Sequence, residues 1–255
     1  MTPTIGDTAR GRFAGVRMII RNNAHWYAAA ALVAALSSAI AETQRATTVR
    51  LAGGTIAAGT ALMTVASLAV SHYIYDTSPL MRWDWLGDLR QYPARWLNLH
   101  AGADEATPAL RQLFGQSSGT VIDIFDASQM KSRSIAVARR AGAAVDPVAG
   151  DSLDDLPDGA AFDTVYVIFA AHELRHPDAR VRLFARIRRL LATGGSVIVV
   201  EHTRNLANLA AFGPGAFHFF SRHTWLRTFS TAGFRVRETR SMTAFVSAFV
   251  LEVTE

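Results

Sequence analysis

Apolar and polar residues follow two different patterns along this chain, and the change falls near residue 76. Residues 22–41 carry no formal charge, and neither do residues 51–75. Each stretch is about the length that a helix needs to cross ~30 Å of hydrocarbon. The pattern therefore predicts two transmembrane helices, over about 24–41 and 51–73, in an N-terminal segment of residues 1–75.

Aromatic and small residues in these stretches agree with a membrane hairpin. Trp26, Tyr27, Tyr73 and Tyr75 stand near the ends, where an interfacial belt would place them. Small residues recur every four positions, which lets helices approach closely in lipid: Ala31, Ala35, Ala39, Gly53, Ala57 and Ala61. Arginines precede the first span at positions 10, 12, 17 and 21. By the positive-inside rule we expect the N-terminus and everything after Asp76 on the cytoplasmic side of the inner membrane.

Two other interpretations of the first span remain open. It is rich in alanine, so it could be a soluble helix packed on a domain or on a dimer partner. Its basic flank and the sequence Ala39-Ile40-Ala41 before Glu42 also imitate a signal peptide with its cleavage site.

Residues 76–255 alternate short apolar runs with amphipathic stretches and are predicted to form one α/β domain. Strands are expected at 95–99, 120–125, 164–169, 196–201, 234–239 and 245–253. Helices are expected over 106–114, 131–142 and 178–195, the last ending at Gly194-Gly195. Such alternation predicts a parallel sheet with ligands at the carboxyl ends of its strands, and the last two runs suggest an antiparallel edge hairpin.

The order of these segments resembles the class I S-adenosylmethionine-dependent methyltransferases. The most specific part is residues 161–204, which are similar to the family's fourth strand, the next helix, an L-x-P-G-G turn and the fifth strand, with Thr193 in place of proline. The resemblance implies a Rossmann-like fold with a mostly parallel seven-stranded sheet, and S-adenosylmethionine as the cofactor.

The cofactor-binding residues implied by the resemblance begin in the loop LNLHAGADEAT. Of the family's acidic residue and G-x-G-x-G pattern this loop keeps Gly102, with Asn98, His100 and Asp104 at the other positions. Asp104 or Glu105 could hold the amino group of the cofactor. Asp126, taken as the end of the second strand, could accept two ribose hydroxyls. Asp151, Ser152 and Phe169 complete the expected cofactor site.

Histidines and carboxylates gather at the predicted strand ends and are the catalytic candidates: His172, Glu173, Glu201, His202 and His218. Methyl transfer needs a positioned nucleophile that loses its proton, and a histidine of near-neutral pKa oriented by a carboxylate suits that step. A divalent ion held by Glu201, His202 and a further ligand is the alternative, but no H-x-x-x-H spacing supports it, so no metal is predicted. His223 lies in the same capping segment as His218.

Arg175 and Arg204 follow the same strand ends and could anchor an acidic or phosphate-bearing group, or could be solvated surface residues. The capping segment itself is aromatic, with Phe212, Phe217, Phe219, Phe220 and Trp225. These rings could pack in the core or line an apolar substrate tunnel that faces the membrane.

Composition narrows the functional classes. The absence of cysteine excludes disulfides, thiol nucleophiles and Cys-ligated zinc. The net charge of +5 comes largely from residues 1–50, so it is read as a topology signal and no nucleic-acid partner is expected. The leading hypothesis is a membrane-anchored methyltransferase acting on a lipophilic small molecule, such as a quinol, an aryl or polyene lipid, or a lipid head group. The alternative is a non-catalytic membrane adaptor with the same fold; the oligomeric state is not indicated.

Overall fold

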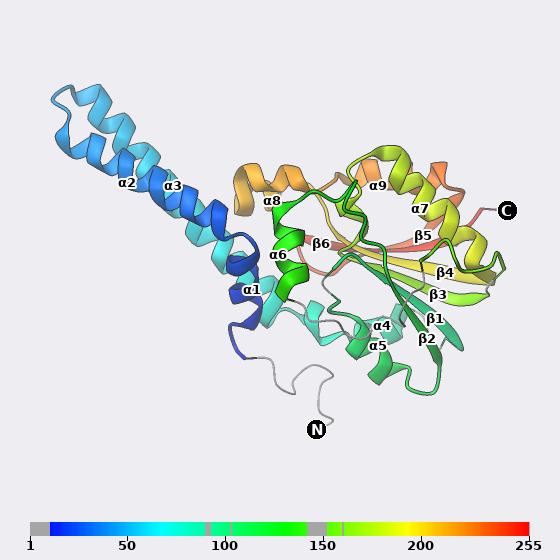
Figure 1. The fold of residues 1–255 in the computed structure, drawn as a ribbon. Coiled ribbons are helices and arrows are strands. Elements are labelled where there is room, and N and C mark those ends of the chain that lie inside the picture. Colours follow the sequence, from blue (N-terminus) through cyan, green and yellow to red (C-terminus); the bar gives the residue numbers. More distant parts are fainter. Residues whose placement is uncertain (1–10, 90–92, 103, 142–151, 160, 255) are drawn as a thin grey trace.

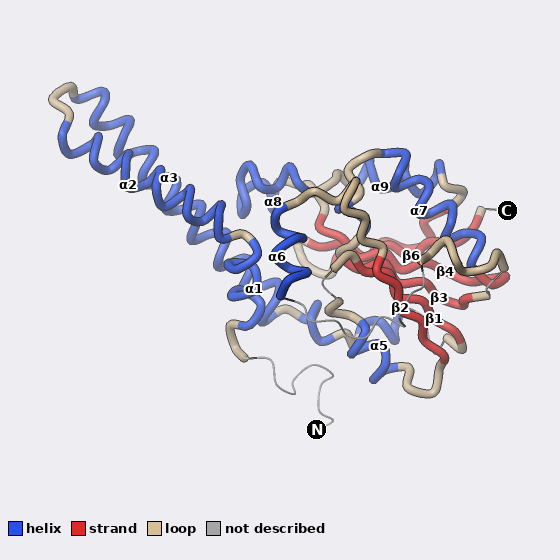
Figure 2. Tube along the Cα trace, in the orientation of Figure 1, coloured by secondary structure: helices blue, strands red, loops and turns tan. Residues whose placement is uncertain are grey.

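A twisted sheet with helices on both faces forms the body of the protein, and a long helical hairpin projects from it (Figure 1). The computed structural model describes residues 11–89, 93–102, 104–141, 152–159 and 161–254. Figure 2 shows that all the strands lie in the body, whereas the hairpin consists of two helices joined by a loop at its tip. The predicted α/β fold and the two long apolar helices are therefore confirmed.

The sheet has the strand order β2-β1-β3-β4-β6-β5. The first four strands by sequence are β1 (Arg95–His100), β2 (Ser118–Asp123), β3 (Phe162–Ile168) and β4 (Leu191–His202), and they pair in parallel. The last two, β5 (Phe234–Ser241) and β6 (Val246–Val253), form the expected antiparallel hairpin, with β6 also antiparallel to β4. The β1, β3 and β4 carboxyl ends consequently lie along one edge.

Two details of the sequence-based prediction need correction. Seven strands were expected, whereas the described residues form six; residues 142–151, between α6 (Arg133–Ala141) and β3, lie outside them. The helix expected to reach Gly195 is α7 (Pro177–Leu190), and β4 begins at Leu191. Gly194 has φ +74°, so it bends the start of this strand instead of ending the helix.

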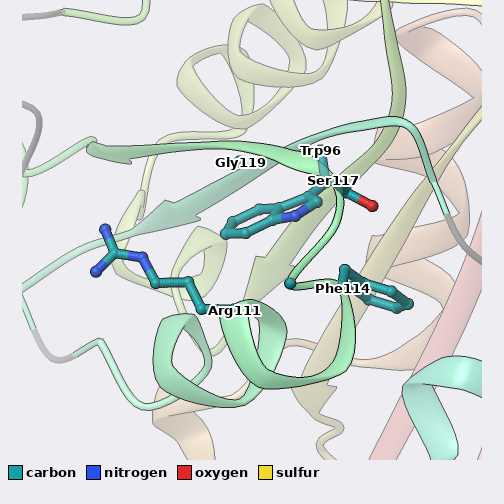
Figure 3. A pocket seen from close by; sticks show the side chains of 6 residues that line it. Trp96, Arg111, Phe114, Ser117 and Gly119 are labelled. Atoms are coloured by element: carbon teal, nitrogen blue, oxygen red, sulfur yellow. The ribbon is translucent and has the colours of Figure 1, made fainter.

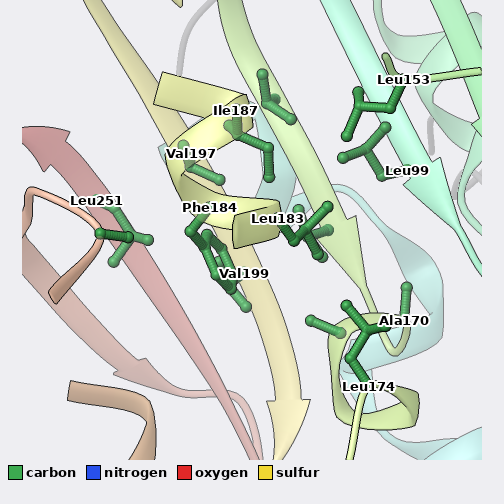
Figure 4. Close-up of a cluster of buried hydrophobic side chains, with 14 of the residues drawn as sticks. Leu99, Leu153, Ala170, Leu174, Leu183, Phe184, Ile187, Val197, Val199 and Leu251 are labelled. Carbon is green, nitrogen blue, oxygen red and sulfur yellow. The ribbon is translucent and has the colours of Figure 1, made fainter. Parts of the chain in front are cut away.

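Helices cover both faces of the sheet because alternate strand residues point to opposite sides. On one face α6, α7 and α9 (Arg222–Thr231) cover Leu99, Val197 and Val199, as Figure 4 shows for the α7 contacts. On the other face α5 (Thr107–Leu113), η2 (Pro79–Arg82) and α4 (Trp85–Leu89) cover Trp96, Tyr166 and Ile198. This alternation decides on which face each functional side chain at a strand end emerges.

The projecting hairpin consists of α2 (Ala24–Thr43) and α3 (Thr47–His72). A Cβ on Gly53 would lie 2.7 Å from the carbonyl oxygen of Ser37, so the two backbones meet closely at this small residue. The Tyr27 hydroxyl lies 3.2 Å from Ser67 Oγ and joins the helices at their other end. Large apolar side chains point outward along the hairpin, among them Leu32, Leu36, Leu51, Leu62 and Val65.

A short π-helix, η1 (Tyr73–Thr77), joins the hairpin to the body. The Asp76 carboxylate accepts hydrogen bonds from the backbone N–H groups of Gly15 (2.6 Å) and Val16 (3.0 Å) at the start of α1 (Ala14–Asn22). The other end of α1 reaches α6, where the Ser134 hydroxyl donates to Asn23 Oδ1 at 2.9 Å. The helix α1 therefore wedges between the base of the hairpin and the body (Figure 1).

Candidate functional site

The histidine and carboxylate pairs that are adjacent in sequence separate in the structure. Glu201 and His202 are consecutive residues of β4, so their side chains point to opposite faces of the sheet. Glu201 turns toward the loop after β3, which contains the 3-10 turn η3 (Ala171–Glu173), and His202 turns toward η1. Two separate clusters result, and the metal set of Glu201 with His202 is not formed.

The first cluster is built around His172. Its ring Nδ1 lies 2.8 Å from Glu201 Oε2, and its backbone N–H donates to Glu201 Oε1 at 3.2 Å. Glu201 is fully buried, so this carboxylate fixes both the position and the ring orientation of His172. The other ring nitrogen, Nε2, faces Glu173 Oε1 at 3.5 Å, and His218 Nε2 approaches the same oxygen at 3.6 Å. His172, Glu173, Glu201 and His218 are thus brought together as the first cluster.

The charges of the first cluster shift its pKa values away from neutrality. Burial alone would lower the pKa of His172, but Glu201 and Glu173 outweigh it and raise this pKa to about 10. Burial opposes ionisation of Glu173, yet His172 and His218 hold the pKa of this carboxyl well below its usual range. The expectation of a near-neutral histidine is therefore wrong for His172, which carries a proton at pH 7.

The second cluster surrounds His202 with aromatic rings. His202 stacks on Phe219 with ring centroids 4.6 Å apart, and Phe169 and Phe212 approach it at 5.3 and 6.4 Å. The Tyr75 hydroxyl lies 2.7 Å from His202 Nε2. Burial, together with the charges of His172 and His218, lowers the pKa of His202 to about 3, so this histidine is neutral. It is not a near-neutral base either.

Tyr75 was missed as a site residue because it looked like part of the aromatic belt of the second apolar stretch. The π-helix at the end of α3 turns it into the body, where it meets His202. Sequence offers no direct signal for this contact, since 127 positions separate the two residues.

The two arginines that follow the strand ends have different surroundings. Arg175 donates from Nη1 to the carbonyl oxygens of His172 (3.2 Å) and His218 (2.6 Å), so it ties η3 to η4 (Gly213–His218). Its guanidinium carbon also lies 4.4 Å from the Phe220 ring centroid. Arg204 lies over the exposed Phe217 ring at 5.7 Å. Arg175 therefore positions His218 through its backbone carbonyl. The other histidine of the capping segment, His223 on α9, is exposed and lies outside the cluster.

The loop after β1 places the expected cofactor-binding residues on the same edge of the sheet. Asn98 Nδ2 donates to Asp104 Oδ1 (3.1 Å) and to Thr107 Oγ1 (2.9 Å), and the backbone N–H of Thr107 donates to the same Asp104 oxygen. Gly102 has φ +108°, a conformation that only glycine adopts without strain. The retained glycine is thus the one whose backbone conformation requires it.

Buried polar atoms at the end of β1 and in the loop after it fit an amino-acid group such as the methionine part of S-adenosylmethionine. Asn98 Oδ1, Asp104 Oδ2 and His100 Nε2 are buried without a hydrogen-bond partner among the described residues. His100 Nδ1 accepts from the Gly102 N–H at 3.4 Å, which leaves Nε2 as a donor. Two acceptors and one donor match the ammonium and the carboxylate of that group, and unpaired buried polar atoms are otherwise costly.

The acid at the end of the second strand is Asp123 and not Asp126. β2 ends at Asp123, whose carboxylate pairs with Arg139 of α6. Asp126 lies three residues further on, where it accepts hydrogen bonds from the backbone N–H of Ser128 and from Gln129 Nε2, and these bonds hold its pKa below the ordinary value. The alternating pattern of residues 120–125 placed the strand two residues too late. The sequence analysis did not single out Asp123 or Arg139, which form an ion pair at this strand end.

The remaining cofactor candidates are only partly described. Asp151 lies outside the described residues. Ser152 forms a turn, its N–H donating to Asp155 Oδ2 at 2.9 Å. Phe169 has φ +50° at the end of β3 and packs against Tyr75 and His202, which places it beside the second cluster. Glu105 lies half-buried next to Asp104.

A pocket of about 210 Å³ lies at the opposite edge of the sheet, where β1 and β2 begin (Figure 3). Its lining includes Trp96, Arg111, Phe114 and Gly119. The Trp96 indole lies directly over Gly119, so a side chain there would overlap the ring. This pocket contains none of the predicted site residues.

Comparisons with known proteins agree with the resemblance seen in the sequence. Residues 97–199 match the family described as "Methyltransferase domain". No curated protein matches the chain. Among solved structures, a SAM-dependent methyltransferase from Aquifex aeolicus aligns with a TM-score of 0.53 at 14% identity, covering 75% of this chain and 98% of that one. The pyocyanin biosynthetic protein PhzM aligns with a TM-score of 0.51 at 18% identity, covering 94% and 73%.

The O-methyltransferase NcsB1 from neocarzinostatin biosynthesis was solved with S-adenosylmethionine and 2-hydroxy-5-methyl naphthoic acid. It aligns with a TM-score of 0.50 at 16% identity, covering 96% of this chain and 74% of that one. At these identities the structural likeness concerns the fold.

Proposed function

Because this chain carries a class I S-adenosylmethionine-dependent methyltransferase domain, we propose that it is anchored in a membrane and methylates a lipophilic small molecule. Its domains would then be an anchor of residues 1–75 and a catalytic domain of residues 76–255. One observation carries the proposal: the residues that continue the second long helix of the hairpin supply a side chain to the candidate site.

The hairpin has the properties of a membrane anchor. α2 contains 20 residues and α3 contains 26, which correspond to about 30 and 39 Å of helix. Only 6% of each apolar window is buried within the protein, so neither helix is a core helix of the body. Large apolar side chains on the hairpin are exposed, for example Leu51 with an exposed fraction of 66% and Leu62 with 69%. Contact with water is unfavourable for such side chains, and contact with lipid would remove them from water.

The hairpin also supports the proposed orientation. Its tip, between Thr43 and Thr47, lies far from the body, whereas α1 and the body share the other end (Figure 1). The arginines of α1 and the catalytic domain would then be on the same, cytoplasmic side of the membrane.

The aromatic second cluster lies between the hairpin and the first cluster. α3 packs against α8 (Leu206–Phe212), and a Cβ on Gly213 would approach Met63 Cε at 3.1 Å. Tyr73 and Phe212 both contact Phe245, so aromatic rings continue from the base of the hairpin to His202. An acceptor with an apolar ring or chain would meet apolar side chains along this series of rings as it left lipid.

Two sets of residues at the sheet edge would bind the cofactor and the acceptor, respectively. S-adenosylmethionine supplies the methyl group when it is bound, and Asn98, His100 and Asp104 are placed to hold its amino-acid part. We assign the binding and deprotonation of the acceptor to His218 of the first cluster, because His172 already carries a proton and 37% of the His218 side chain is accessible. Arg175 and Glu201 position the two histidines of this cluster.

The test uses the full chain in detergent or lipid nanodiscs, with isotope-labelled S-adenosylmethionine and an extract of the producing cells. Calorimetry is expected to show cofactor binding, and the labelled methyl group is expected in the organic phase of the extract. No cofactor binding by a folded sample would overturn the assignment of the cofactor site. Label found only in water-soluble products would overturn the lipophilic acceptor. In a separate test on membranes isolated from cells that produce the protein, release of the chain by an alkaline wash would overturn the anchor.

A further inference from the structure

The first cluster has the geometry of a metal site as well as that of an ion-pair network. One possible ligand atom from each of His172, Glu173 and His218 lies within 4.8 Å of the other two, and Nε2 of each histidine faces Glu173 Oε1. The two N···O distances, 3.5 and 3.6 Å, are longer than ordinary hydrogen bonds of about 2.7–3.2 Å. Two ligand atoms that each lie about 2.1 Å from a tetrahedral zinc ion are about 3.4 Å apart. The distances from Glu173 Oε1 to the two histidine nitrogens are close to this value.

We propose that His172, Glu173 and His218 bind one divalent transition-metal ion such as Zn²⁺, with Glu201 orienting His172. Two imidazoles and one carboxylate are ligands that these ions prefer, and they leave at least one coordination position open.

The environment of each ligand supports the assignment. Glu201 accepts from Nδ1 of His172, which leaves Nε2 as the nitrogen that faces the ion; a buried carboxylate behind a ligating histidine is the usual arrangement at zinc sites. The ion would displace to solvent the second proton that this ring holds at pH 7, because only the neutral imidazole can act as a ligand. Glu173 is 92% buried, and its Oε2 atom has no hydrogen-bond partner among the described residues, although a buried carboxylate oxygen is costly to leave unpaired. Arg175 holds the backbone of His218 against that of His172.

The role of the ion in the reaction rests on the proposed function, whereas the existence of the metal site does not. An acceptor could reach an ion bound at the first cluster from the side of solvent, because His218 is the most exposed of the three ligands. A hydroxyl oxygen of the acceptor bound there would lose its proton more readily, because the cation lowers the pKa of a bound O–H group. The proton would leave to solvent, and the oxygen lone pair would remain available for the methyl group.

The experiment titrates the full, chelator-treated chain in detergent with Co²⁺, whose visible absorption reports coordination, and then displaces it with Zn²⁺. We expect one ion per chain, with no comparable binding of Mg²⁺, which prefers oxygen ligands. Glu173→Gln and His218→Ala are expected to weaken binding by at least tenfold, and Glu201→Gln by about 10–100-fold. His223→Ala, an exposed histidine outside the cluster, is the matched control and should bind like the wild type.

Each variant is checked for folding by thermal unfolding and for S-adenosylmethionine binding in the absence of metal. His218→Ala alters a partly exposed side chain, so it remains informative if Glu173→Gln does not fold. The absence of Co²⁺ binding by the wild type, or equal binding by the wild type and His218→Ala, would overturn the metal site. Cofactor binding without metal binding would leave the proposed function intact, whereas metal binding without cofactor binding would overturn that function alone.

Discussion

Burial of His202 as a neutral imidazole should make the protein sensitive to mild acid. Only 5% of this residue is exposed, and aromatic rings surround it. Its pKa is lowered to about 3, chiefly by burial, whereas an unfolded histidine has a pKa of about 6.5. Below pH 6.5 the unfolded chain therefore binds a proton at this position that the folded chain excludes, and stability falls as the pH falls.

The size of the effect follows from these two pKa values. One pH unit corresponds to about 1.4 kcal/mol for a single group that titrates only in the unfolded state. Between pH 7 and pH 5 the His202 contribution to the free energy of unfolding should therefore decrease by about 2 kcal/mol. For a chain of this size that loss lowers Tm by roughly 4–8 °C. Above pH 7 the contribution is constant.

The assay compares Tm at pH 7 and pH 5 for the wild type and for the double variant Tyr75→Phe/His202→Leu. Replacing both partners of the 2.7 Å contact leaves no unpaired hydroxyl, and leucine does not titrate. The decrease in Tm should be smaller in the double variant by the amount calculated above. A variant of the exposed His223, His223→Gln, should behave like the wild type. Equal decreases in the wild type and the double variant would refute the reasoning.

Two glycines give further tests, each with a control glycine that has open space around it. Gly102→Ala should cost about 1–3 kcal/mol of stability and weaken S-adenosylmethionine binding in calorimetry, because φ is +108° and a Cβ would overlap Arg139; Gly87→Ala should change neither. Gly15→Ala should release α1 and speed tryptic cleavage after Arg17 and Arg21, because a Cβ there would lie 2.8 Å from the Tyr75 carbonyl oxygen and 2.9 Å from Asp76 Oδ1. Gly11→Ala should leave the cleavage rate unchanged, and equal rates in the two variants would contradict the docking of α1 through Asp76.

Much of the fold follows from local patterns. Runs of β-branched residues such as 196–201 are long enough and apolar enough to be strands buried on both faces, and the structure has them in β4. The two uncharged stretches became α2 and α3 with ends close to the expected ones. Errors arose where local signals compete, as at Gly194, which ends helices in many proteins but here bends the start of β4.

The candidate site was predictable as a location but not as a set of contacts. Parallel strands bring their carboxyl ends to one edge, so His172, Glu201 and the loop containing Gly102 were expected there. Which of these side chains meet depends on the face from which each emerges. The β4 alternation pairs Glu201 with His172, although His202 is its neighbour in sequence.

The class of the fold, the two apolar helices and the edge of the sheet that carries the polar residues could all be predicted from the sequence, because each depends on hydrophobic periodicity and strand direction. Three contacts could not be predicted in this way: Tyr75 enters the site from the end of the hairpin, Asp123 and not Asp126 ends the second strand, and Glu173 lies between two histidines. These contacts depend on the packing of elements that are distant along the chain. No local pattern contains that information.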